Sequence, residues 1–122
     1  MIGTFLSGAV AASFLALGAG AFAAPRALAE NYGIPLTDDA ALAYVRGLGA
    51  RDAVLGFIII ALLVRREHSA LATTVGFSAL VGASDFALVV AARRGDAPSS
   101  LAIHGIGTLG LLAVSGLVRS GL

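Results

Sequence analysis

Four long apolar stretches dominate this sequence, and each is long enough to cross a lipid bilayer as a helix. A membrane-spanning helix needs about 20 mostly apolar residues. The stretches predict helices over residues 2–24, 38–64, 69–92 and 100–118, within a single domain that covers residues 1–122. Short connections place sequential helices antiparallel to each other. We therefore expect an all-α fold, an integral membrane four-helix bundle with up-down-up-down topology.

Composition and charge narrow the range of functions. Of the 122 residues, 58% are hydrophobic and only 12% are charged, whereas soluble domains contain about 25% charged residues. A net charge of +1 without a long basic run argues against nucleic-acid binding. The sequence contains no cysteine, which excludes disulfides and thiolate metal sites, and its two histidines alone make a poor metal site. We expect neither a metal nor another cofactor.

The first stretch has a second interpretation. The segment AFAAP (21–25) contains an A-x-A-like site, so residues 1–23 also fit a cleaved signal peptide. However, no lysine or arginine precedes the apolar run, and the run is longer than the apolar region of a typical signal peptide. These features favour a retained transmembrane helix.

The segment between the first two spans, PRALAENYGIPL (25–36), predicts a short helix that lies at the membrane interface. The helix should cover residues 26–32 and end at Gly33, with Tyr32 at the interface between lipid and water. It is placed to cover one mouth of the bundle. Thr37 fits the N-cap position of the second span.

Ionisable residues within the spans carry the functional signal. A charged side chain inside a span costs about 2.5–3.5 kcal/mol, so Arg51, Asp52 and Asp85 need partners or water. From the helix rise of about 1.5 Å per residue, Asp52, Asp85 and His104 each lie about 20 Å or more from the surface that holds the termini. They therefore share one level. Glycine, serine and threonine flank them at helical spacing, which indicates that they face other helices rather than lipid.

The partners of these side chains are less determined. Arg51 and Asp52 are adjacent, so they diverge by about 100° around a helix and should not pair with each other. One arrangement pairs Arg51 with Asp85 and Asp52 with His104. Another leaves Arg51 free while the two carboxyl groups share a proton. The candidate acid–base residues are Asp52, Asp85 and His104; the candidate substrate-binding residues are Arg51, Tyr44 (seven residues earlier and on the same side of the helix), Ser78 and Thr108.

Five short motifs form a pattern along the chain: an early glycine-bounded helix (GAVAASFLALG, 8–18), a turn (NYGIP, 31–35), a G-x-R-D motif (GARDAVLG, 49–56), a mid-helix aspartate (SDFALV, 84–89) and a histidine that opens the last helix (AIHGIG, 102–107). On these motifs the whole chain resembles a family of small bacterial and fungal four-span membrane proteins with an unknown-function label. The resemblance implies the four-span fold and a multi-pass protein of a bacterial inner membrane, without an activity.

Three functions fit these residues. The first is a membrane-embedded acid–base enzyme, such as an isomerase, cyclase or hydratase, or a binding pocket for a lipophilic small molecule, because two carboxylates and a histidine supply an acid and a base. The second is a proton-coupled small transporter or channel that works as an oligomer. The third is a non-catalytic accessory protein whose buried polar groups only lock helices together. We favour the first, and expect as partners the lipid bilayer, a lipophilic small molecule and, in a homodimer, a second copy of the chain.

Overall fold

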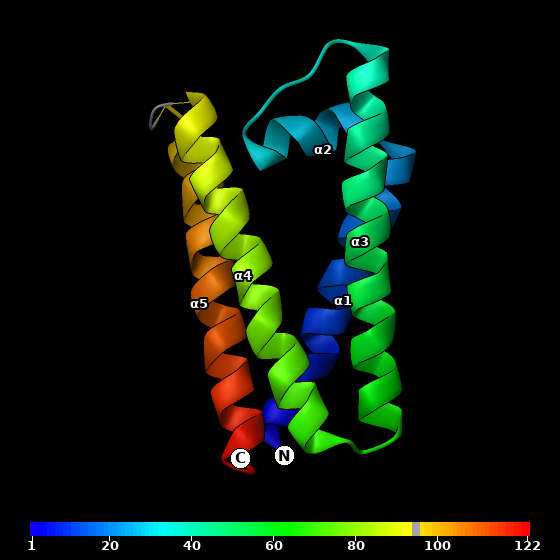
Figure 1. Ribbon diagram of the computed structural model, residues 1–122, viewed down its shortest axis with the longest axis vertical. Coiled ribbons are helices and arrows are strands. Elements are labelled where there is room, and N and C mark those ends of the chain that lie inside the picture. Colours follow the sequence, from blue (N-terminus) through cyan, green and yellow to red (C-terminus); the bar gives the residue numbers. More distant parts are fainter. Residues whose placement is uncertain (94–95) are drawn as a thin grey trace.

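The computed structural model describes residues 1–93 and 96–122, and in these ranges the chain forms five helices. They are α1 (Ile2–Ala23), α2 (Pro25–Tyr32), α3 (Asp39–Val64), α4 (His68–Arg93) and α5 (Pro98–Arg119). The four long helices begin and end within two residues of the predicted spans, and each is long and apolar enough to cross a membrane. Successive long helices run antiparallel, with both termini at one end (Figure 1). The predicted all-α, up-down-up-down bundle is confirmed.

The four long helices pack as two pairs, α1 with α3 and α4 with α5. Glycine allows the close approach within each pair. A Cβ added at Gly49 of α3 would collide with Ala21 of α1, and one added at Gly82 of α4 would lie 2.5 Å from Oγ1 of Thr108 on α5. In a membrane, helices associate through such close van der Waals packing rather than through exclusion of water.

The two pairs meet at the end of the bundle that holds the termini and separate toward the other end (Figure 1). Where they meet, a buried apolar cluster, called the core cluster below, draws side chains from all four long helices. Its members are Ala11, Phe14, Ile59, Leu71, Ala72, Val75, Val114 and Val118. At the other end, α2 crosses the space between the pairs, and its Ala29 packs into a second cluster formed with Ala21, Leu42 and Val45.

The short helix α2 ends where Gly33 adopts a left-handed backbone conformation, with φ of 103°. A Cβ at this position would lie 2.8 Å from the Cβ of Ser100, so glycine meets both the backbone requirement and the close approach to α5. The predicted short helix and its glycine end are confirmed. The predicted N-cap of the next helix is wrong by one residue. Asp38, rather than Thr37, caps α3, because its carboxylate accepts hydrogen bonds from two N–H groups at the positive end of the helix.

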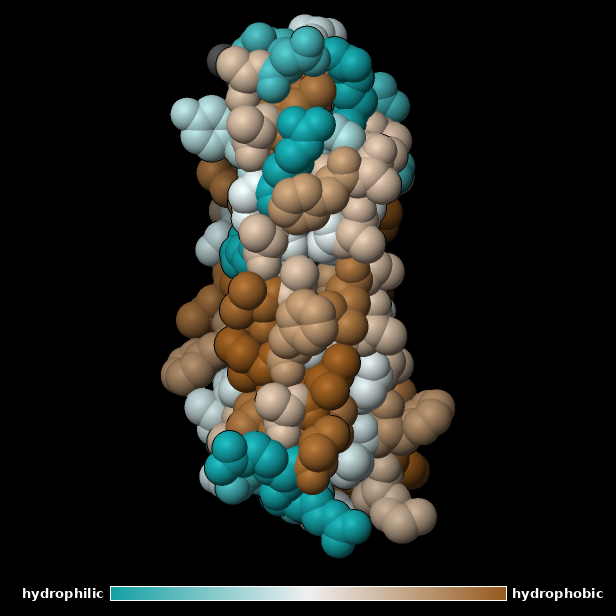
Figure 2. All heavy atoms as spheres, turned by 90° about the vertical axis from the view of Figure 1, so that its right-hand side faces the viewer, coloured by the Kyte–Doolittle hydropathy of each residue, from teal (hydrophilic) through white to brown (hydrophobic). Residues whose placement is uncertain are grey.

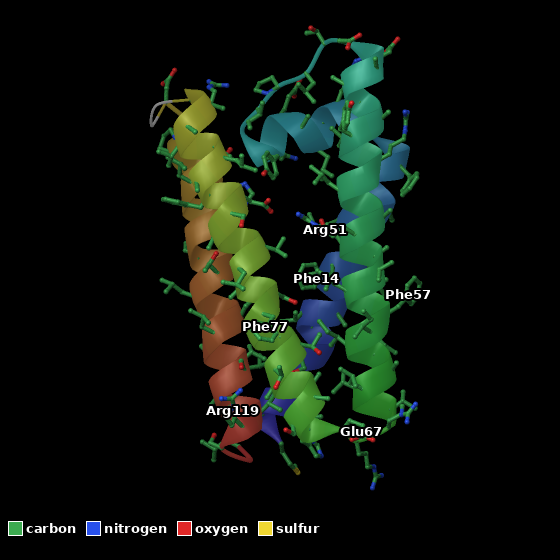
Figure 3. All side chains as sticks on the ribbon, in the orientation of Figure 1. Phe14, Arg51, Phe57, Glu67, Phe77 and Arg119 are labelled. Atoms are coloured by element: carbon green, nitrogen blue, oxygen red, sulfur yellow. The ribbon has the colours of Figure 1, made fainter. Side chains whose placement is uncertain are left out.

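The outer surface is apolar between two polar ends. Figure 2 shows a hydrophobic band around the middle of the molecule on the side formed by α3 and its neighbours, with hydrophilic residues gathered at both ends. Phe57 of α3 points away from the bundle within this region (Figure 3) and is exposed. Such an apolar belt is the surface that lipid tails cover in a membrane protein.

Candidate functional site

A cavity of about 1000 Å³ lies between the two helix pairs, beneath α2. Its walls are mostly apolar and come from all five helices. Phe14, which points into the space between the pairs (Figure 3), belongs to both the cavity wall and the core cluster, so the cavity borders the core cluster. Lining residues such as Ser13 on α1 and Gly107 on α5 are exposed as well. The cavity is therefore not fully enclosed by the bundle.

Three charged side chains meet on the wall of this cavity, and we call them the charged cluster. Nε and Nη2 of Arg51 lie 3.0 and 2.9 Å from Oδ1 of Asp52, and Nη2 lies 3.5 Å from Oδ2 of Asp85. The two aspartate side chains are only 12% and 11% exposed, and that of Arg51 is 35% exposed. Arg51 extends from α3 into the space between the pairs (Figure 3), so its guanidinium joins one helix pair to the other.

The predicted ion pair between Arg51 and Asp85 is confirmed, and Arg51 is therefore not free. The prediction that Arg51 and Asp52 would not pair is wrong. Their Cα–Cβ bonds do diverge around the helix, but the long arginine stem lets the guanidinium bend back to the neighbouring carboxylate. The predicted pair of Asp52 with His104 is also wrong, because Nε2 of His104 donates to the backbone carbonyl of Tyr32 at 3.0 Å.

Tyr32 was expected at the membrane interface but bonds directly to the charged cluster. Its hydroxyl donates to Oδ1 of Asp85 at 3.0 Å, and its ring meets the ring of His104 edge-on, with centroids 4.8 Å apart. Burial, and then the negative charge and hydrogen bond of Asp85, raise the pKa of Tyr32. The phenol thus keeps its proton and stays a donor. The sequence contains one signal for such a partner, because two buried carboxylates need more hydrogen-bond donors than one guanidinium supplies.

Two side chains of α5 bind the end of α2. Oγ of Ser100 donates to the carbonyl of Asn31 at 3.1 Å, next to the bond from His104 to Tyr32. Both bonds satisfy carbonyl oxygens that have no partner within the helix. Because a carbonyl only accepts, Nε2 of His104 carries a proton, and Nδ1 is the nitrogen left for other chemistry. The short helix is thus tied to the second helix pair as well as to the first.

The remaining predicted residues, Tyr44, Ser78 and Thr108, also line the cavity. Ser78 and Thr108 donate to backbone carbonyls four residues earlier in their own helices, at 2.9 and 2.8 Å. Their oxygen atoms keep lone pairs that can accept hydrogen bonds. Tyr44 is 79% exposed at the rim. Within residues 1–93 and 96–122, no three histidine or acidic side chains lie close enough together to share a metal ion.

Residues 11–118 match a family described as a domain of unknown function, DUF4267. The chain belongs to the DUF4267 family. The match contains Tyr32, His104 and all three residues of the charged cluster, so the candidate site lies within the DUF4267 domain. No curated protein and no solved structure matches the chain.

Proposed function

We propose that this protein, in a bacterial inner membrane, binds a lipophilic small molecule in the cavity beneath α2 and exchanges a proton with it. One observation carries the proposal: a mostly apolar cavity of about 1000 Å³, contained in one chain, bears the charged cluster on its wall. An apolar cavity with a few convergent polar groups is the usual form of a small-molecule site. Ionisable groups are costly in a membrane and generally mark function.

The charged cluster supplies the partners of an acid–base reaction. A carboxylate, Asp52 or Asp85, can take a proton from a carbon next to a carbonyl group of the ligand. Arg51 can donate hydrogen bonds to the carbonyl oxygen as it gains negative charge. If the ligand carries a carbon–carbon double bond next to that carbon, the same carboxyl group can return the proton to the far carbon of the double bond; the double bond then moves into conjugation with the carbonyl group and no further reactant is needed. This is an isomerase-type reaction, in which Tyr32 positions Asp85 and Nδ1 of His104 is a further candidate proton carrier.

The buried apolar packing beside the cavity supports a pocket rather than a transport path. The core cluster, including Phe14, is buried beside the cavity and joins all four long helices. A proton-coupled transporter would have to open this apolar packing, because transport requires access from both faces of the membrane. A purely structural role for the charged cluster would leave the cavity itself without a purpose.

Filling the cavity tests whether it binds a molecule. A Cβ at Gly110 of α5 meets nothing within 4 Å, and Gly110 lines the cavity. Gly116 of the same helix has equally open surroundings but lies outside the lining. Leucine favours a helix over glycine by about 1 kcal/mol, so both leucine variants should fold. Native mass spectrometry of protein released from mild detergent measures the bound molecule. We expect it to detect a lipophilic molecule on the wild-type protein and on Gly116→Leu, but not on Gly110→Leu. Equal retention by the two variants would refute the pocket.

Deuterium exchange tests the chemistry without knowledge of the substrate. Protein with its bound molecule is incubated in deuterated water, and the extracted molecule is weighed by mass spectrometry. We expect the wild-type protein to introduce deuterium at carbon, and Asp52→Asn or Asp85→Asn to introduce much less. A bound molecule that gains no carbon-bound deuterium from the wild-type protein would rule out proton transfer and leave a binding pocket.

A further inference from the structure

The two carboxyl groups of the charged cluster are bonded in different ways. Arg51 contacts Asp52 through one oxygen, since Nε and Nη2 lie 3.0 and 2.9 Å from the same atom, Oδ1. Asp85 uses both oxygens: Oδ1 accepts from the hydroxyl of Tyr32 at 3.0 Å, and Oδ2 lies 3.5 Å from Nη2 of Arg51. The two aspartate side chains are almost equally exposed, so their bonding, rather than their burial, distinguishes them.

The second oxygen of Asp52, Oδ2, is accessible from the cavity. Within residues 1–93 and 96–122, the side-chain hydrogen bonds of Asp52 all fall on Oδ1. In the same ranges, every fully buried side-chain oxygen has a hydrogen-bond partner. Oδ2 is therefore not fully buried, and because Asp52 lines the cavity, a molecule in the cavity can reach this atom.

A proton can move on or off Oδ2 of Asp52 without disturbing the bonds of the charged cluster. A protonated carboxyl group carries its hydrogen on one oxygen and still accepts hydrogen bonds at the other. With the hydrogen on Oδ2, Oδ1 of Asp52 still accepts from Arg51. A proton on either oxygen of Asp85 would instead compete with a group that already lies there, the hydroxyl of Tyr32 or the guanidinium of Arg51.

Asp85 is also held in place by α2 and α5. Its donor, Tyr32, belongs to α2, and Nε2 of His104 on α5 bonds the backbone carbonyl of Tyr32 at 3.0 Å while the two rings meet edge-on. These contacts fix the carboxyl group of Asp85, and with it the ion contact to Arg51 on the other helix pair. A carboxyl group fixed in this way is suited to orienting the guanidinium.

We infer that Asp52 is the residue that exchanges the proton, through Oδ2, and that Asp85 is a positioning residue that orients Arg51. This inference rests on the proposed function, because it divides the roles within the same site. Oδ2 takes a proton from the carbon next to the carbonyl group, and the electron pair of that C–H bond forms an enolate whose oxygen accepts from Arg51. Oδ2 then returns the proton to the far carbon of the double bond.

A lipophilic carbodiimide tests which carboxyl group faces the cavity, without any substrate. Dicyclohexylcarbodiimide adds to a protonated carboxyl group: the proton goes to a nitrogen of the reagent and the carboxyl oxygen bonds to its central carbon. The acyl group then migrates to nitrogen and leaves a stable N-acylurea. The wild-type protein is treated at mildly acidic pH in phosphatidylcholine nanodiscs, and peptide mass spectrometry locates the adduct. We expect labelling of Asp52 to exceed labelling of Asp85 several-fold.

Substitution of Tyr32 should change this pattern. Tyr32→Phe removes the donor to Oδ1 of Asp85, so labelling of Asp85 should rise several-fold while labelling of Asp52 stays the same. Tyr44→Phe is the matched control, because Tyr44 lines the cavity but is exposed at its rim, and it should leave both labels unchanged.

The labelling outcomes separate the inference from the proposed function. If Asp85 in the wild-type protein is labelled as much as Asp52 or more, the division of roles is overturned and the pocket stands. If Tyr32→Phe leaves the labelling of Asp85 unchanged, the hydrogen bond does not shield Asp85 and the bonding argument fails. If neither carboxyl group is labelled, the cavity does not bring a lipophilic molecule to the charged cluster, which refutes the pocket and the inference together.

Chemical rescue tests the acid–base role itself, with deuterium incorporation into the copurified molecule as the readout. Asp52→Ala should introduce no carbon-bound deuterium, and sodium formate should restore part of the incorporation, because formate supplies a carboxylate in the space left by the deleted group. Asp85→Ala should introduce less deuterium than the wild-type protein and should not respond to formate. Wild-type incorporation by Asp52→Ala, or a response to formate in Asp85→Ala, would overturn the assignment. Absence of incorporation by the wild-type protein would refute proton transfer and both roles, whereas labelling of Asp52 by the carbodiimide would still support the pocket.

Discussion

Nη2 of Arg51 lies 2.9 Å from Oδ1 of Asp52, the next residue in the chain. The same nitrogen lies 3.5 Å from Asp85 on the other helix pair. Replacing Arg51 with methionine would therefore leave two largely buried carboxylates without their cation. We expect Arg51→Met to lower the free energy of unfolding by about 3 kcal/mol, the cost of breaking a buried ion pair. Unfolding by SDS in mixed micelles, followed by circular dichroism, measures the change.

The matched control is Arg26→Met. Arg26 and Asp39 form a shorter ion pair, 2.6 Å, but their side chains are 61% and 87% exposed. Exposed pairs contribute about 0–1 kcal/mol, so this variant should unfold almost like the wild-type protein. Equal destabilisation by the two variants would show that burial does not give the charged cluster its importance.

Tyr32 provides a spectroscopic probe of the charged cluster. The chain has two tyrosines and no tryptophan, so Tyr44→Phe leaves Tyr32 as the sole phenol. In this background the phenolate absorbance should appear well above the ordinary tyrosine pKa of about 10, because burial and Asp85 raise the pKa of Tyr32. Adding Asp85→Asn should lower the pKa toward its ordinary value without restoring it, since burial remains. A titration that Asp85→Asn leaves unchanged would argue against the hydrogen bond.

The same shift gives the stability a pH dependence. Above the ordinary pKa of about 10, an unfolded chain loses the phenolic proton while the folded protein keeps it. The folded state then binds more protons, so the free energy of unfolding falls as the pH rises between the ordinary and the raised pKa of Tyr32. We expect this alkaline loss to be smaller in Tyr32→Phe than in the wild-type protein, as measured by SDS unfolding at several pH values. An equal loss in both would exclude Tyr32 as its source.

Two glycines of α3, two positions apart, should respond to alanine in opposite ways. A Cβ at Gly49 would collide with Ala21 on α1, whereas a Cβ at Gly47 meets nothing within 4 Å. Gly49→Ala should destabilise the fold by about 1–3 kcal/mol through overpacking. Gly47→Ala should stabilise it by up to about 1 kcal/mol through helix propensity. Thermal unfolding in detergent distinguishes the two. A stabilising Gly49→Ala would mean that α1 and α3 are farther apart than described.

His104 should hold α2 in place through its Nε2–H bond to Tyr32. His104→Leu removes the donor, while His104→Gln keeps an N–H at a similar distance from the backbone. We expect faster amide hydrogen exchange at the end of α2 in the leucine variant, and near wild-type exchange in the glutamine variant. Deuterium incorporation into a bound molecule distinguishes this positioning role from a role in proton transfer. If Nδ1 carries the proton, the glutamine variant should lose deuterium incorporation while the amides of α2 stay protected from exchange.

The spans and the level of the charged cluster could be predicted because both follow from properties local to each helix. Length and apolarity define the spans, and the constant rise of a helix brings Asp52 and Asp85 to one depth. The Arg51–Asp85 pair followed from the cost of an unpaired charge in lipid. These predictions needed no knowledge of how far apart the helix pairs stand.

The partner choices failed where long side chains or chain reversals decide the geometry. The angle of about 100° between neighbouring residues of a helix predicted that Arg51 and Asp52 would point apart. The arginine side chain is long enough to bridge that separation. The same helical spacing predicted that Tyr44 would supply the hydroxyl group of the site. Tyr32 supplies it instead, because α2 crosses the space between the helix pairs and brings Tyr32 to Asp85. The direction of a short helix after a loop is a tertiary property, and the sequence carries little signal for it.

The pairing of α1 with α3 and of α4 with α5 also bears on biogenesis. The first pair comes from the amino-terminal half of the chain and the second from the other half, so each hairpin can enter the bilayer with its own partner as it leaves the ribosome. Arg51 and Asp52 arrive with the first hairpin, and Asp85 with the second. Chemistry at this site would therefore begin only when the two hairpins dock, after translation of both is complete.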